Sequence, residues 1–212
     1  MRLSEKTLEL SICSQLAANL GRRVIWFGLT QRQEARAGFD ACTRWGAQIL
    51  ILQFKASTHL RDGGATSRFS APHRQMQALC ARARGARQVF YVLPHLGTTE
   101  ELSNNNDLLT QTWLLDASLL APIQPPTTRR GTLRKGGEHH LDLAPPWVTV
   151  CSDPVKLGVV SLNSLAAEIG PASLPNLNQS LGDEIEGRAW PFSRKSLALA
   201  ILPREALSRA TR

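Results

Sequence analysis

The chain has 212 residues, of which 42% are hydrophobic and 20% charged, so it has enough apolar side chains for a core and is not expected to be disordered. Its 25 Lys and Arg exceed its 17 Asp and Glu, which gives a formal net charge of +8, and twenty of these cations are Arg. Guanidinium groups match phosphate oxygens, so this balance favours an anionic partner such as nucleic acid, although many basic proteins bind none. No apolar run approaches the roughly 20 residues of a membrane helix, and the first ten residues contain acids that a secretory signal lacks. We therefore expect a soluble, cytoplasmic protein with no membrane partner.

The four cysteines are far apart in the sequence, and no two of them stand at the spacing of a zinc motif. We expect Cys13, Cys42, Cys80 and Cys151 to be small core residues in a reducing compartment. A disulfide framework is not expected.

The first predicted element is an amphipathic helix over residues 4–20, because large aliphatic side chains recur every four residues from Leu8 onward. At about 100° per residue, Glu9 falls in the middle of this apolar stripe, so its carboxylate is expected to face inward. A partial salt bridge from Glu9 to Arg22 or Arg23 is the alternative.

Three strands are predicted next. Residues 22–29 are rich in β-branched and aromatic side chains, and residues 39–44 and 47–56 form two further strands joined by a tight turn near Trp45 and Gly46. The third strand is almost continuously apolar, which is typical of a strand covered on both faces.

A second helix and a fourth strand complete the pattern. The elements expected in this region are a loop over 63–70, a helix from Pro72 to Gly85, a strand over 87–93, and a helix over 98–109 capped by Thr98 or Thr99. The order of the first six elements is therefore α-β-β-β-α-β.

The pattern weakens beyond residue 121. Residues 122–146 are basic and rich in glycine and proline, so we expect a long surface loop. Beyond this loop we expect a strand over 147–151, a short helix over 163–169, a polar connection over 174–187 and a closing helix over 196–209. We predict that residues 1–120 form the core and that residues 121–212 form an extension packed on it.

Side chains suited to catalysis gather at the end of the third strand. Side chains alternate between the faces of a strand, so Gln53 and Lys55 project to the same side. If the second and third strands pair as a hairpin, Asp40 comes close to Gln53. An acid, an amide and an amine then converge at one edge of the sheet.

This layout suits metal-assisted hydrolysis of a phosphodiester bond, which needs oxygen ligands for Mg²⁺ or Mn²⁺ and a cation near the phosphate. Asp40 would bind the ion directly, Gln53 would bind through its side-chain carbonyl, and Glu9 would supply a second carboxylate. Lys55 would orient or help to deprotonate the attacking water and would stabilise charge on the phosphate.

The element order, with an acid on the first helix, Asp on the second strand and Gln-x-Lys on the third, resembles the PD-(D/E)xK nuclease superfamily. It looks most like the Mrr-type restriction endonuclease branch, in which glutamine replaces the middle acid. The resemblance covers roughly residues 4–94. It implies an α/β restriction-endonuclease-like fold with a mixed central sheet flanked by helices, and it places the metal and catalytic roles on Glu9, Asp40, Gln53 and Lys55.

Three departures from the family pattern leave another interpretation open. No proline precedes Asp40, Gln53 brings no charge to the metal site, and the RecB-type Q-x-x-x-Y motif is half present, as Gln75 with Leu79 at the tyrosine position. In the alternative, Lys55 is a solvated strand end, Asp40 is a turn acid and Gln53 is a core amide bonded to backbone.

Three further residues are auxiliary candidates. Glu34 would replace Glu9 as the second acid, or it is a surface carboxylate. His73 and Gln75 stand near the start of the second helix, where they would contact the phosphate or join a hydrogen-bond network around Lys55. Capping and surface bonding are the alternative roles for these two side chains.

Two other groups of polar side chains remain. Basic side chains that would contact a nucleic-acid backbone, or would only be solvated, are Arg74, Arg82, Arg84, Arg129, Arg130, Arg134 and Lys135. A metal site is not expected at Glu138, His139, His140 and Asp142, because adjacent histidines on a loop point to different sides.

These patterns predict a Mg²⁺-dependent endonuclease that hydrolyses DNA, with RNA left open as a substrate. The resemblance implies a place in bacterial restriction or anti-phage defence and action as a homodimer. The competing prediction is a weak or inactive nuclease-fold subunit that binds nucleic acid or serves as a scaffold in a multi-protein defence complex.

Overall fold

The computed structural model describes most of the first 169 residues. The described segments are residues 1–19, 24–30, 33–34, 37–45, 48–61, 66–83, 87–105, 107–126 and 137–169. The predictions for Arg22, Arg23, residues 127–136 of the basic loop and everything after residue 169 therefore lie outside the described residues. Among the described segments, no helix combines the length and the apolar character that crossing a membrane requires.

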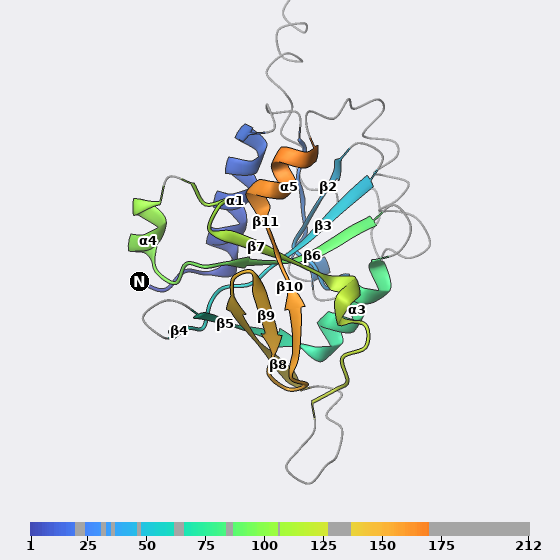
Figure 1. The fold of residues 1–212 in the computed structure, drawn as a ribbon. Coiled ribbons are helices and arrows are strands. Elements are labelled where there is room, and N and C mark those ends of the chain that lie inside the picture. Colours follow the sequence, from blue (N-terminus) through green and yellow to red (C-terminus); the bar gives the residue numbers. More distant parts are fainter. Residues whose placement is uncertain are drawn as a thin grey trace, which may run out of the picture.

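A six-stranded sheet forms the centre of the molecule (Figure 1). Its strands are, in spatial order, β1 (Phe27–Gly28), β2 (Ala41–Trp45), β3 (Gln48–Phe54), β6 (Arg87–Pro94), β7 (Thr112–Asp116) and β11 (Val160–Ser161). The β3–β6 pair is parallel and the other neighbouring pairs are antiparallel. The predicted α/β fold with a mixed central sheet is confirmed at this level, and the more specific restriction-endonuclease-like fold stays a prediction.

Helices cover both faces of this sheet. The helices with given bounds are α1 (Glu5–Asn19), α3 (His73–Arg82), α4 (Thr99–Asn104), the 3-10 helix η2 (Ala117–Leu120) and α5 (Leu162–Ile169). Leu8 of α1 shares an apolar cluster with Leu52 of β3, whereas Met76 of α3 shares a second cluster with Ile51. Adjacent residues of a strand face opposite ways, so β3 is covered on both faces, as its continuous apolar sequence predicts.

The predicted hairpin is present. Ala41 of β2 pairs with Leu52 of β3, and Trp45 pairs with Gln48. Beyond the first of these pairs the register places Asp40 opposite Gln53, as predicted.

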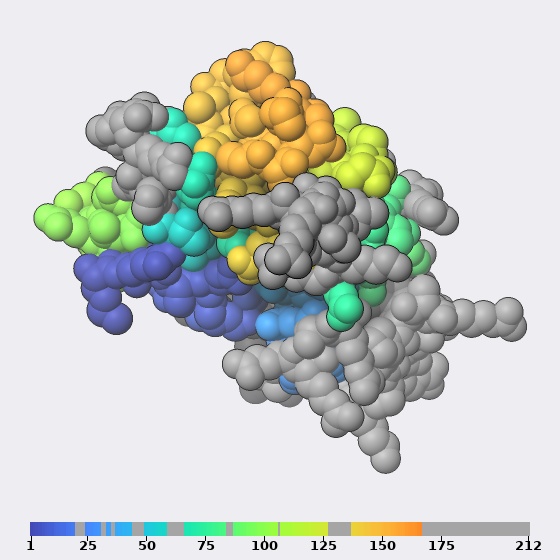
Figure 2. Space-filling model, turned by 90° about the horizontal axis from the view of Figure 1, so that it is seen from below, coloured from blue at the N-terminus to red at the C-terminus, as the bar shows by residue number. Residues whose placement is uncertain are grey.

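A second sheet contains five antiparallel strands. They are, in spatial order, β10 (Val155–Gly158), β9 (Trp147–Val150), β8 (Glu138–Ala144), β5 (Thr66–Pro72) and β4 (His59–Arg61). On the face drawn in Figure 2, the yellow and orange residues after 137 gather into one lobe of the surface, and the blue first helix lies along another edge. Since β5 pairs with β8, this sheet joins residues from both sides of the predicted boundary at residue 120.

Two segments predicted to be loops contain strands. β5 overlaps the predicted 63–70 loop, and β8 lies inside the predicted 122–146 loop. Both strands alternate between buried and more exposed positions, but their buried side chains include Ser67, Ala71 and His139. The alternation of apolar and polar side chains that reveals a strand is therefore too weak to recognise in the sequence.

Other elements differ mainly in length. β1 covers Phe27–Gly28 in the described part of the predicted 22–29 strand, and α4 ends at Asn104. Thr98 caps α4 as predicted, in a capping box with Glu101. The strands β4, β7, β10 and β11 were not predicted, whereas β9 and α5 lie where the sequence predicts them.

The four cysteines differ in burial. Cys13 and Cys42 are buried in the core as predicted, and Cys80 is half-buried. Cys151 is exposed, which corrects its predicted core position: it follows β9, where its thiol lies 3.2 Å from Asp142 Oδ2.

Candidate active site at the Asp40 edge of the sheet

Asp40 lies directly before β2 and is fixed by the hairpin. Its backbone N–H donates to the carbonyl of Leu52, and its Oδ2 accepts from the backbone N–H of Phe54 at 2.7 Å and from Gln53 Nε2 at 2.8 Å. Gly38, two residues earlier, has a φ of +76°, and a Cβ there would meet Ala78 Cβ of α3 at 3.2 Å. Glycine thus permits the turn that delivers Asp40 to the sheet edge.

The amide of Gln53 is oriented by two acceptors. Its Nε2 donates to Asp40 Oδ2 and, at 3.0 Å, to the carbonyl oxygen of Phe54, so the NH₂ end faces the carboxylate. The side chain is buried, and no described residue donates to its Oε1. In this arrangement Gln53 positions Asp40, and ligation of a metal through its carbonyl requires the amide to turn over.

Helix α1 brings a second carboxylate to the same edge. Glu9 is buried at 7% exposure, as the helical pattern predicts. Its two oxygens lie 3.0 and 2.8 Å from Nζ of Lys6, one turn earlier. The alternative of a bridge to Arg22 or Arg23 lies outside the described residues.

Ser4 fixes the start of this helix, because its hydroxyl accepts from the backbone N–H of Thr7 at 3.0 Å.

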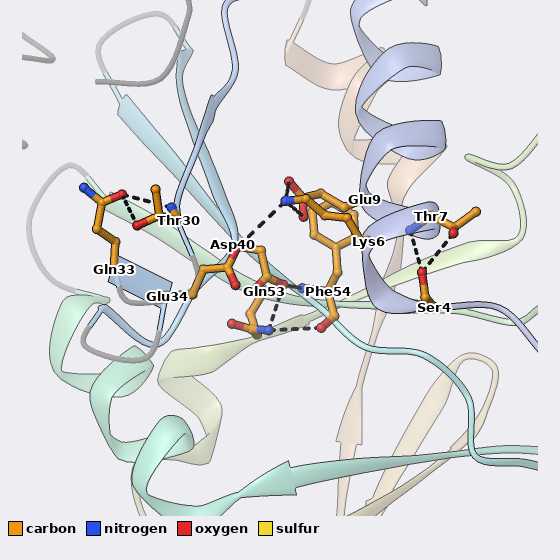
Figure 3. A network of polar contacts seen from close by, with 10 residues as sticks. All are labelled: Ser4, Lys6, Thr7, Glu9, Thr30, Gln33, Glu34, Asp40, Gln53 and Phe54. Carbon is orange, nitrogen blue, oxygen red and sulfur yellow. Dashed lines mark hydrogen bonds and ion pairs between the residues drawn. The ribbon is translucent and has the colours of Figure 1, made fainter. Parts of the chain in front are cut away.

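Glu34 joins the site from the segment before Asp40. Its Oε1 lies 3.8 Å from Lys6 Nζ, so the ammonium lies between Glu34 and Glu9 (Figure 3). The structure therefore brings Glu34 close to Glu9, and the role of Glu34 as a second acid stays a prediction.

Lys55, directly after β3, is buried at 6% exposure and is not a solvated strand end. Its Nζ lies 3.5 Å from Oε1 of Glu5 in the first turn of α1. A buried ammonium with one carboxylate partner, at the edge that also carries Asp40, is typical of a functional site.

Four carboxylates interact electrostatically in this region, and we call Glu5, Glu9, Glu34 and Asp40 the acidic cluster. Burial raises the pKa of Asp40 from 3.8 to about 7, the bond from the Phe54 N–H lowers it, and the other three carboxylates raise it further. Burial also raises the pKa of Glu34. When fully ionised, the four carboxylates of the acidic cluster outnumber the ammonium groups of Lys6 and Lys55 by two. One divalent cation would neutralise this excess negative charge.

The donor set of the acidic cluster fits a hard divalent cation, because carboxylate oxygens are the ligands that Mg²⁺ and Mn²⁺ prefer. Within the described segments, no three Asp, Glu, His or Cys side chains come close enough together to hold an ion. The Lys6 ammonium lies 2.8 Å or more from its carboxylates, whereas a Mg²⁺–oxygen bond is about 2.1 Å. A cluster arranged around an ammonium is thus wider than one closed on a metal ion.

The other two auxiliary candidates contact other parts of the fold. His73 is buried, and its Nδ1 lies 2.9 Å from His139 Nε2 of β8. Gln75 is half-buried, and its Cγ would be 3.8 Å from a Cβ on Gly38, which places it behind the segment that leads to Asp40.

The histidine and acid group of β8 is divided by strand alternation. His139 faces inward and also bonds to Ser152, whereas His140 is exposed. Asp142 forms a two-point ion pair with Arg68 of β5. These side chains stabilise the second sheet.

Few of the predicted nucleic-acid contacts lie in the described segments. Arg74 is exposed on α3, and Arg82 is half-buried, with its Nη1 donating to the carbonyl of Ala78 at 2.9 Å. The remaining members of that prediction lie outside the described residues, namely Arg84, Arg129, Arg130, Arg134 and Lys135.

Sequence reasoning missed the roles of Lys6 and Glu5. Lys6 stands three residues before Glu9, a spacing that places two side chains on one helix face, so this pair was visible in the sequence. The Lys55–Glu5 pair joins a strand end to a helix start and depends on how α1 packs on β3, which no local pattern contains.

Comparisons with models of known families, with curated proteins and with solved structures found no match to this chain.

Proposed function

We propose that the protein is a metal-dependent nuclease that hydrolyses phosphodiester bonds of DNA. The observation that carries this proposal is the burial of Glu9, Asp40, Gln53 and Lys55 together at one edge of the central sheet, next to Glu34. Burying charged groups destabilises a fold unless they are paired, so such a concentration is retained where function needs it.

The residues divide the chemistry among them. Asp40 and Glu9, with Glu34 beside them, would hold the ion, and the bound ion would activate a water molecule and neutralise charge on the phosphate. Gln53 and the Phe54 N–H hold the Asp40 carboxylate in one orientation. The ammonium of Lys55 would orient the attacking water and stabilise the negative charge that grows on the phosphate.

The family resemblance adds a biological setting to this proposal. It suggests bacterial restriction or anti-phage defence, with a homodimer cutting one strand at each site, and a cytoplasmic location. RNA remains a second possible substrate, because the acidic cluster does not distinguish the two sugars.

A second candidate is a nuclease-fold subunit that binds nucleic acid without cutting it. Gln53 favours this candidate, since it supplies Asp40 with an N–H donor where the family pattern commonly has a third acid. The two candidates share the fold and the positive charge and differ in catalysis.

Cleavage assays separate the candidates. Linear, supercoiled and single-stranded DNA are incubated with the purified chain and Mg²⁺, Mn²⁺ or EDTA. We expect metal-dependent cleavage that falls about 10²-fold or more in Asp40→Asn and in Lys55→Gln.

The matched controls are Glu100→Gln and Lys156→Gln, which remove exposed charges of the same sign elsewhere on the described surface. These variants should cut at the wild-type rate. DNA binding without cleavage under every metal condition, unchanged in Asp40→Asn and Lys55→Gln, would favour the binding subunit and overturn the enzyme.

A further inference from the structure

Lys6 lies among carboxylates from three parts of the chain. Its Nζ is 2.8 and 3.0 Å from the two oxygens of Glu9 and 3.8 Å from Oε1 of Glu34, and the negative charge of Asp40 also acts on it. In Figure 3 the Lys6 side chain runs from α1 toward the side of the site that carries Glu34 and Asp40. One ammonium therefore holds together groups that would otherwise repel one another.

The residue type suits this position. Only five of the 25 cations in the chain are lysines, and two of these five, Lys6 and Lys55, lie at this edge of the sheet. An ammonium is a compact point charge, as a metal ion is, whereas a guanidinium is a flat fork that binds carboxylates side-on.

The surroundings of Lys6 also allow it to leave. Its side chain is 54% exposed, while the Glu9 side chain that it contacts is 9% exposed. The ammonium can thus swing into water while Glu9 stays in place, because Glu9 belongs to the buried face of α1. An exposed lysine loses little on this movement beyond one ion pair.

We propose that the Lys6 ammonium holds the acidic cluster in place of a divalent cation and that the cation binds by displacing Lys6 into solvent. This inference rests on the proposed function, because it requires a cation among Glu9, Glu34 and Asp40. Around the ammonium these carboxylates lie too far apart to hold an ion, so they must close on the cation as Lys6 leaves. Lys6 then sets the metal concentration at which the site fills. The acidic cluster stays assembled at lower concentrations, and the ion must compete with the Lys6 ammonium to enter.

Titration of the full-length chain with Mn²⁺, followed by calorimetry and by the electron paramagnetic resonance signal of free Mn²⁺, tests the displacement. Lys6→Gln keeps a hydrogen-bond donor but removes the charge, and we expect it to bind Mn²⁺ roughly three- to tenfold more tightly than the wild type. Lys6→Arg keeps the charge and should stay within about twofold of the wild type, since it still competes.

The control Lys156→Gln removes the same charge from β10 in the second sheet, where the lysine lies over the ring of Trp147. It should not change the affinity for Mn²⁺. In EDTA, Lys6→Gln should also melt at a lower temperature than the wild type, because the acidic cluster has lost its counter-charge, and Mn²⁺ should raise its melting temperature by more than that of the wild type.

The outcomes are distinct. If the wild type binds Mn²⁺ and Lys6→Gln binds it equally or more weakly, the displacement is overturned and the proposed metal site stands. The same conclusion follows if Lys156→Gln binds Mn²⁺ as much more tightly than the wild type as Lys6→Gln does. Absence of Mn²⁺ binding in both the wild type and a folded Lys6→Gln overturns the metal site as well.

Discussion

Asp40 combines burial with hydrogen bonds and with the electrostatic effect of neighbouring carboxylates. Its side chain accepts two hydrogen bonds from the end of β3 and lies within the influence of three other carboxylates. Burial and these neighbours raise its pKa to about 7, so the carboxyl group binds a proton in the folded chain at pH values where an exposed aspartate is ionised. A divalent cation would oppose that protonation, which links metal binding to pH at this residue.

This shift predicts a pH dependence of stability in EDTA. The folded pKa of Asp40 is above the unfolded value of 3.8, so its contribution is fully present below pH 3.8 and is lost as the pH rises toward 7. The free energy of unfolding of the wild type, measured by urea denaturation relative to Asp40→Asn, should fall across this window by at most roughly 1.4 kcal/mol per pKa unit. The exposed control Glu100→Gln should retain the wild-type slope, and an identical slope in Asp40→Asn would refute the shift.

Helix α1 is the element that assembles the site, since Glu5, Lys6 and Glu9 all belong to its first turns. The position of Glu9 could be predicted, because helical periodicity alone places it on the apolar stripe. The closeness of Asp40 to Gln53 could also be predicted, because a hairpin register is local, but the hydrogen bond between them could not. The strand β5 could not, because its buried positions include Ser67 and it is recognisable only through its partners β4 and β8.

The cap of α1 yields a prediction at the scale of the element. Ser4→Ala removes the acceptor for the Thr7 N–H, so the free energy of unfolding should fall by about 1 kcal/mol. Ser14→Ala, at an exposed position inside the same helix, should leave it unchanged or raise it by up to about 0.5 kcal/mol, because alanine is the better helix former. Equal effects of the two substitutions in chemical denaturation would show that Ser4 is no cap.

The buried histidine pair joins α3 to β8 and predicts a second pH effect. Burial lowers the pKa of His73 and of His139 below 6.5, and the neighbouring His73 lowers that of His139 further. The stability from this pair is therefore present above pH 6.5 and is lost as the pH falls below it. His139→Gln should flatten the loss of unfolding free energy between pH 7 and 5. His140→Gln, on the exposed side of β8, is the control, and the same flattening in both variants would contradict the assignment.

At the scale of the molecule, the charge of +8 and the acidic cluster would have opposite effects on the nucleic acid of the proposed function. Arginine dominates the positive charge and favours phosphate, whereas the acidic cluster repels phosphate unless a cation is present. Substrate binding and catalysis should therefore respond differently to metal removal. Composition alone predicts that binding survives metal removal, and only the assembled site predicts that cleavage does not.

DNA binding in EDTA checks this separation. We expect a labelled duplex to bind the wild type with or without metal, and the affinity, measured by fluorescence anisotropy, to fall at least about tenfold between 50 and 200 mM salt. Arg74→Gln, at an exposed position of α3, should weaken binding and reduce the salt dependence, and Glu100→Gln should not. Binding that disappears in EDTA at low salt would show that charge alone does not hold the DNA.

The most direct measurement is an anomalous difference map from crystals of the chain grown with Mn²⁺. A Mn²⁺ peak at ligand distance from the carboxylates of Asp40 and Glu9, with the Lys6 ammonium turned away from Glu9, is the predicted result. A map with no peak at this edge of the sheet, and with Lys6 still bound to Glu9 at saturating Mn²⁺, would contradict the proposal that the acidic cluster is a metal centre.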